Sequence, residues 1–124
     1  MTDPATRILV VDDDEAVREN LAECLEAEGH DVATAADGFA ALERLSRDPL
    51  PEVVLLDLSM PGLDGHGLAS AIRALPRCRA LRLVLITGHT GLAPGATAAV
   101  DGVLHKPFSV DELLAVLHAA PRDG

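Results

Sequence analysis

The sequence predicts a single α/β domain in which a doubly wound parallel sheet of five strands carries helices on both faces. Its 124 residues are the usual size of one compact domain. Hydrophobic residues make up 48% of the chain, enough to fill a core. Short apolar runs alternate with helical repeats along the chain, which is typical of the strand–helix units that build a parallel sheet. We therefore expect one domain over residues 1–124, with its core over about 6–120.

The first unit begins with a continuous apolar run at residues 8–11, as expected of a strand that is buried on both faces. Val17, Leu21 and Leu25 then recur at every fourth position, which predicts a helix. Gly29 can end this helix, because glycine is the usual residue just past a helix C-terminus.

The second and third units follow the same pattern. Residues 31–35 predict a short strand, and the helix after it begins near Gly38. Residues 53–56 predict the next buried strand, which a Pro61–Gly62 turn follows. Four apolar positions mark the third helix: Leu68, Ala71, Ile72 and Leu75.

In the last two units, the sequence predicts the final helix more clearly than the fourth one. Residues 83–86 and 102–104 predict the fourth and fifth strands. Between them the chain is punctuated by Gly88, Gly91, Pro94 and Gly95. We therefore expect a shortened or irregular fourth helix, at about 96–100. The final helix is marked by Val110, Leu113, Leu114 and Leu117.

The composition narrows the possible functions. The net charge is −10, from 20 acidic and 10 basic residues, and such a surface repels nucleic acids and anionic membranes. Cys24 and Cys78 lack the spacing of a metal site, so we interpret them as idle thiols in a reducing compartment. No apolar run approaches the length of a membrane span, and the first seven residues are too polar for a signal peptide. We expect a soluble, cytoplasmic protein.

Polar residues stand directly after most of the predicted strands. The set consists of Asp12, Asp13 and Asp14, then Asp57, Thr87 and Lys106. Because ligands of open parallel sheets bind beyond the carboxyl ends of the strands, we expect these groups to meet at one edge. Asp14 is the exception, since it is well placed to cap the first helix.

This set of groups suits phosphoryl transfer to a carboxylate. Two carboxylates about 4 Å apart repel by about 4 kcal/mol at an effective dielectric near 20, so Asp12, Asp13 and Asp57 require a cation. Their hard oxygen atoms suit Mg²⁺ or Mn²⁺. Asp57 would be the nucleophile, and Thr87 and Lys106, the only lysine in the chain, would contact the phosphoryl oxygens.

Four stretches carry a specific resemblance to a known family: ILVVDDD at 8–14, VLLDLSMPGLDG at 54–65, LITGH at 85–89 and HKPF at 105–108. In this order and at these intervals they resemble a response-regulator receiver domain of two-component signalling, similar to the single-domain chemotaxis regulators. The resemblance covers essentially the whole chain. It implies a flavodoxin-like (βα)5 fold.

The resemblance also implies roles for the acidic residues. Asp57 would be the phospho-acceptor, phosphorylated by a histidine kinase or a histidine phosphotransfer protein. Asp13, Asp57 and the backbone carbonyl of Ser59 would bind Mg²⁺ directly, and Asp12 would act through water. Such a domain phosphorylates and dephosphorylates itself but is not a turnover enzyme.

The output side of the switch is implied in the same way. Thr87 would be the switch hydroxyl, Lys106 would contact the phosphate, and the Lys106–Pro107 bond would be cis. A downstream protein would bind the face formed by the fourth helix, fifth strand and fifth helix. The family usually has an aromatic residue where this chain has Val103, so the usual coupling between threonine and aromatic ring cannot operate in its normal form.

Several alternatives stay open. A start at Met1 and an end soon after the last helix favour a stand-alone receiver, but a receiver module of a hybrid histidine kinase fits equally. A pseudo-receiver would keep the fold and signal through binding alone. A haloacid-dehalogenase-type phosphatase is disfavoured because Ser59 stands where a second aspartate is needed. We interpret four arginines, Arg73, Arg77, Arg79 and Arg82, as a solvated face rather than a docking patch.

Overall fold

The computed structural model describes residues 6–57, 65–88 and 100–117 of the chain, in the alternating order expected of strand–helix units. The strands are β1 (Arg7–Val11), β2 (Asp31–Ala35), β3 (Val53–Asp57), β4 (Arg82–Thr87) and β5 (Gly102–His105). The helices are α1 (Glu15–Ala27), α2 (Gly38–Leu45), α3 (Gly65–Arg73) and α4 (Val110–Leu117), with a short 3₁₀ helix η1 (Pro76–Cys78).

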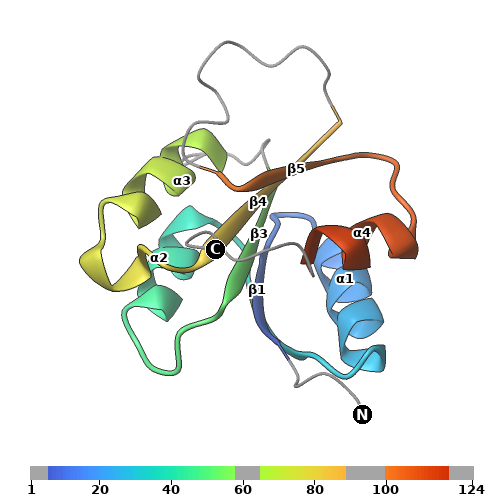
Figure 1. The fold of residues 1–124 in the computed structure, drawn as a ribbon, viewed down its shortest axis with the longest axis horizontal. Coiled ribbons are helices and arrows are strands. Elements are labelled where there is room, and N and C mark those ends of the chain that lie inside the picture. Colours follow the sequence, from blue (N-terminus) through green and yellow to red (C-terminus); the bar gives the residue numbers. More distant parts are fainter. Residues whose placement is uncertain (1–5, 58–64, 89–99, 118–124) are drawn as a thin grey trace.

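All five strands are parallel and form one sheet in the order β2-β1-β3-β4-β5. Figure 1 shows α2 and α3 on one side of this sheet and α1 and α4 on the other. The predicted doubly wound, flavodoxin-like architecture is therefore confirmed. The described residues contain four α-helices, in keeping with the expected irregular fourth unit. Most of the helix expected at about 96–100 lies outside the described residues, and Val100 itself is not helical.

Between their ends, the central strands β1, β3 and β4 are apolar because side chains alternate between two buried faces. On the α2 and α3 side the core is formed by strand residues Leu9, Val11, Val54, Leu56, Leu83 and Leu85, with helix residues such as Leu45, Leu68 and Ile72. On the α1 and α4 side it is formed by Ile8, Val10, Val53, Leu55, Val84 and Ile86, with Leu21, Leu25 and Leu113. This rigid centre fixes the ends of the strands.

Individual capping residues determine where helices α1 and α2 begin and where α1 ends. The Asp14 carboxylate accepts a hydrogen bond from the amide of Val17 at 3.1 Å, as predicted for the α1 cap. Asp37 caps α2 in the same way through the amide of Ala40 at 2.7 Å. Gly29, with φ of 91°, ends α1 in the left-handed region that only glycine adopts easily. Among the described residues, no helix is long and apolar enough to cross a bilayer.

The arginine cluster is not the solvated face that we expected. Arg73 forms a 2.5 Å ion pair with Asp101, in which both side chains are largely buried. Arg82 is only 7% exposed. Only Arg77 and Arg79 remain exposed. The sequence pattern could not reveal this because the clustered arginines belong to different elements, which point them in different directions.

Candidate phosphoryl-transfer site

The carboxyl ends of four strands bring the predicted site residues together. Asp12 and Asp13 follow β1, Asp57 and Thr87 are the last residues of β3 and β4, and Lys106 follows β5. A carboxylate oxygen from each of the three aspartates lies within 4.8 Å of one from each of the others. The parallel register explains this convergence, since Val11 pairs with Leu56, and Asp57 with Ile86.

The backbone also links Thr87 to Lys106. The amide of Lys106 donates a 2.8 Å hydrogen bond to the carbonyl of Thr87, which extends the β4–β5 pairing past its last register pair, Thr87 with His105. The Lys106–Pro107 peptide is cis, as predicted. The lysine is therefore held at the strand edge by its own backbone and not only by its flexible side chain.

The site is half buried and half open. Asp12, Asp57 and Thr87 are 2%, 6% and 1% exposed, whereas Asp13 is exposed. The Lys106 side chain is 39% exposed, and its Nζ lies 3.7 Å from Asp57 Oδ1. Asp57 is therefore largely covered at the end of β3, whereas its neighbours Asp13 and Lys106 are open to solvent.

Burial raises the pKa of Asp12 above its usual value of 3.8, and the negative charge of Asp57 raises it further. One oxygen of Asp12, Oδ1, accepts a hydrogen bond from the amide of Asp14 at 2.9 Å. The other, Oδ2, is buried and has no hydrogen-bond partner in the part of the chain that the structure describes. A buried carboxylate oxygen without a partner is costly, and a bound cation would satisfy it.

These residues fit a hard divalent cation. Three carboxylates with mutually close oxygens, one of them unsatisfied, form the oxygen-rich set that Mg²⁺ or Mn²⁺ prefers. The predicted fourth ligand, the carbonyl of Ser59, lies outside the described residues.

Sequence reasoning missed one contact that shapes this site. Arg18 Nη1 donates a 2.9 Å hydrogen bond to the backbone carbonyl of Asp12. It therefore links α1 to the loop that carries the acidic pair. Arg18 lies one turn into the helix that Asp14 caps, and this spacing was the only available signal.

The fold and the site define a class: a doubly wound α/β domain with an acidic cluster and one lysine at the carboxyl edge of its sheet. The family model described as response regulator receiver domain matches residues 8–118. The chain belongs to this family, the receiver domains of two-component response regulators.

Curated relatives are similar over nearly the whole chain. The response regulator MprA of Mycobacterium leprae is 40% identical over 119 residues, which cover 94% of this chain and 51% of the relative. The MprA of Mycobacterium ulcerans is 39% identical, covering 95% of this chain and 51% of the relative. The chain thus spans about half the length of the curated relatives it matches.

Solved structures show the same likeness. The chemotaxis protein CheY4 of Vibrio cholerae matches with a TM-score of 0.84 at 28% identity, over 91% of this chain and 96% of that one. NtrX of Brucella abortus, in complex with ATP, matches with a TM-score of 0.81 at 36% identity, over 91% of this chain and 26% of that one.

Proposed function

We propose that this domain accepts a phosphoryl group on Asp57 from a histidine kinase or a histidine phosphotransfer protein, in the cytoplasm, and that phosphorylation changes its affinity for a downstream protein. One observation carries the proposal. The Asp57 carboxylate closes β3 among two further carboxylates, with the lysine ammonium 3.7 Å away. This combination of nucleophile, cation-binding oxygens and a counter-charge suits phosphoryl transfer.

In the proposed reaction, an oxygen of Asp57 attacks the phosphorus of a phosphohistidine. The oxygen–phosphorus bond forms as the nitrogen–phosphorus bond breaks, and the released imidazole leaves with the partner protein. Asp12, Asp13 and Asp57, with the Ser59 carbonyl, would hold Mg²⁺. When bound, Mg²⁺ supplies positive charge against the phosphoryl oxygens.

The protein's own groups complete the site. Lys106 would bind a phosphoryl oxygen through its ammonium, and the buried hydroxyl of Thr87 would donate to another. The phosphoryl group carries roughly 1.5 to 2 negative charges at pH 7 in place of the single charge of the carboxylate, and this extra charge draws both groups toward Asp57. Because the Lys106 amide is bonded to the Thr87 carbonyl, the ends of β4 and β5 would move together.

The change that phosphorylation causes in this domain would differ from the change in receivers that have an aromatic residue at the position of Val103. Val103 in β5 is half-buried and packs against the core on the α2 and α3 side. We propose that phosphorylation changes the surface around β5 and α4, and that a downstream protein rather than a nucleic acid or a membrane binds there. The donor kinase would act on this domain either as a separate response regulator or as a module of a hybrid kinase.

Intact-mass spectrometry after incubation with acetyl phosphate tests this proposal. We expect the protein to gain one phosphoryl group when Mg²⁺ is present and none in EDTA. Asp57→Asn should abolish the gain, whereas Asp14→Asn, a matched change at the exposed α1 cap, should leave it intact. Labelling of Asp57→Asn would refute the assignment of the acceptor. No labelling of the unmodified protein would favour a pseudo-receiver.

A further inference from the structure

A hollow lies at the edge of the sheet opposite the acidic site, near the amino ends of β1, β3 and β4. Its volume is about 400 Å³, within the range of small-molecule sites. Leu50, Leu81 and Leu117 contribute apolar walls, and three arginines line it: Arg7, Arg77 and Arg82. The carboxylate residue in the lining is Glu52, whose Oε2 accepts a hydrogen bond from the backbone amide of Arg7.

Arg82 is unusual among the arginines that line this hollow because it is buried. Arg82 is 7% exposed, yet among the described residues its Nη1 donates only to the neutral carbonyl of Leu117, at 3.1 Å. Its Nε is buried and has no hydrogen-bond partner among the residues that the structure describes. No carboxylate of the described residues forms an ion pair with it. A buried guanidinium without a counter-charge is costly, and Arg73 with its partner Asp101 shows how this fold otherwise neutralises one.

The other two arginines supply donors at the rim. Arg7 donates through Nε to the carbonyl of Leu50 at 3.0 Å, and within the described residues no hydrogen bond uses its terminal nitrogens. Arg77 pairs with Asp48 at 2.6 Å, but the Asp48 side chain is 87% exposed. Such exposed pairs contribute little free energy and exchange readily, so Arg77 can turn to a ligand.

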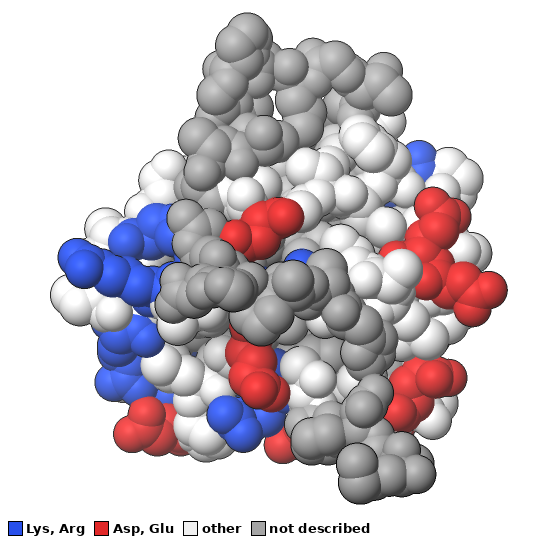
Figure 2. Space-filling model, in the orientation of Figure 1, with Lys and Arg blue, Asp and Glu red and all other residues white. Residues whose placement is uncertain are grey.

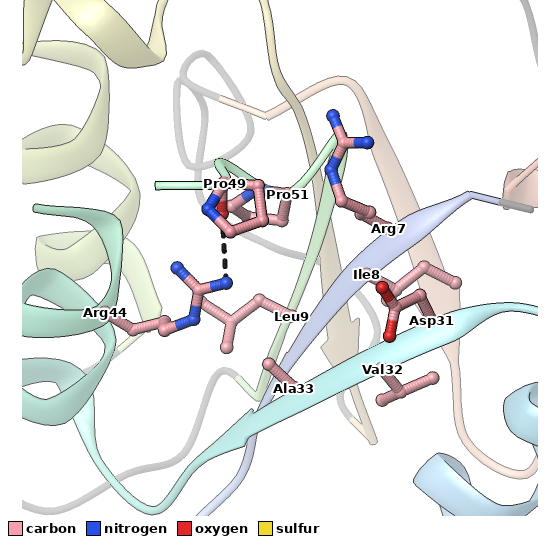
Figure 3. Close-up of a pocket in the computed structure, with 9 residues that line it drawn as sticks. All are labelled: Arg7, Ile8, Leu9, Asp31, Val32, Ala33, Arg44, Pro49 and Pro51. Carbon is pink, nitrogen blue, oxygen red and sulfur yellow. Dashed lines mark hydrogen bonds between the residues drawn. The ribbon is translucent and has the colours of Figure 1, made fainter. Parts of the chain in front are cut away.

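A smaller neighbouring hollow of about 60 Å³ shares Arg7 with this one but offers no comparable site. Figure 3 shows that Arg44 is occupied by the carbonyl of Pro49, to which it donates at 2.9 Å. In the same view the guanidinium of Arg7 points away from Arg44 and Asp31. We therefore assign the positive charge of Arg7 to the larger hollow.

We propose that the larger hollow, lined by Arg7, Arg77 and Arg82, binds an organic anion: a carboxylate carried on an apolar body. The rim guanidiniums would bind the carboxylate, and the buried charge of Arg82 would attract it from below. The leucine side chains would cover the apolar body. Figure 2 shows most basic side chains of this view on the side of α2 and α3, although the whole chain carries a net charge of −10.

A nitrogen-15 NMR titration with sodium benzoate, at ionic strength held constant with chloride, tests the proposal. We expect saturable shifts at the amides of Glu52, Val53 and Arg82. Arg77→Gln and Arg7→Gln should each weaken binding about 10-fold, the loss of one charge-assisted contact. Arg79→Gln is the matched control, because Arg79 is exposed and lies outside the lining, and it should leave the affinity unchanged.

Arg82→Met keeps most of the buried volume and should abolish binding while circular dichroism shows a folded protein. If that variant does not fold, the two rim variants decide. Shifts that do not saturate, or an equal loss in Arg79→Gln, overturn the proposal. Saturation by inorganic phosphate at these amides without any by benzoate overturns the ligand class. Asp57→Asn should bind benzoate normally, so this result is separable from the fate of the phosphorylation proposal.

Discussion

The two edges of the sheet carry opposite charge. At the carboxyl edge Asp12, Asp13 and Asp57 meet a single lysine, whereas at the amino edge Arg7, Arg77 and Arg82 surround a hollow with one glutamate in its lining. Both edges arise from the same strands, because a parallel sheet collects all strand starts on one side and all strand ends on the other. The net charge of the whole chain is −10, yet the two edges of the sheet form local sites of opposite charge.

Disrupting the neutralised arginine near the amino edge should have the largest effect on stability. Asp101 Oδ2 accepts from Arg73 Nη2 at 2.5 Å and from the amide of Leu83 at 2.8 Å. Asp101→Asn leaves the Arg73 charge buried without a counter-charge, so we expect a loss of about 3 kcal/mol in the free energy of unfolding. Urea unfolding measures it. Asp48→Asn, which breaks the exposed pair with Arg77, is the control and should change stability by less than about 1 kcal/mol.

Removing the lysine from the acidic edge should affect chemistry more than stability. Lys106→Gln takes away the ammonium that lies 3.7 Å from Asp57. We expect phosphorylation by acetyl phosphate to slow by about 100-fold, the usual cost of losing one electrostatic contact in a transition state. Initial rates by mass spectrometry measure this. Arg47→Gln, a distant exposed cation, should react at the normal rate, and an unchanged rate in Lys106→Gln would exclude the lysine from the site.

The smallest expected effect has the opposite sign. The pKa of Asp12 is raised in the folded state. The stability that this carboxyl group contributes is therefore present below its usual pKa of 3.8 and is lost as the pH rises through its pKa in the folded protein. At pH 7 in EDTA, Asp12→Asn should therefore stabilise the protein by about 1 kcal/mol. The difference from the unmodified protein should shrink toward pH 4. Thermal unfolding at both pH values checks this, and a less stable variant at pH 7 would contradict it.

The sequence predicted the sheet well because its strands are buried on both faces and read as apolar runs. The same rule misplaced some strand starts, since Arg7 and Arg82 are charged yet begin β1 and β4. The short η1 helix, Pro76–Cys78, carries no repeat long enough to detect. Element identity follows from periodicity, whereas element ends depend on individual contacts.

The acidic site was predictable because the strand-end rule needs only chain order. It placed Asp12, Asp57, Thr87 and Lys106 at one edge without any knowledge of strand order. The amino-edge hollow was not predictable in this way. The chemistry of the hollow depends on Arg82, which is buried without a charged partner among the described residues, while Arg73, nine residues earlier, pairs with Asp101. Residue type cannot distinguish two arginines whose partners are decided by packing.

The strand order also bears on the sequence in which the site can form during synthesis. β1 lies between β2 and β3, so β1 and β3, which deliver all three aspartates, and their neighbour β2 are complete once Asp57 has been made. Lys106 is made 49 residues later and arrives on β5 at the outer edge of the sheet. A nascent chain therefore has its carboxylates before it has their ammonium partner. Until β5 docks, the mutual repulsion of the aspartates opposes closure of the first three strands, and free divalent cations would relieve it.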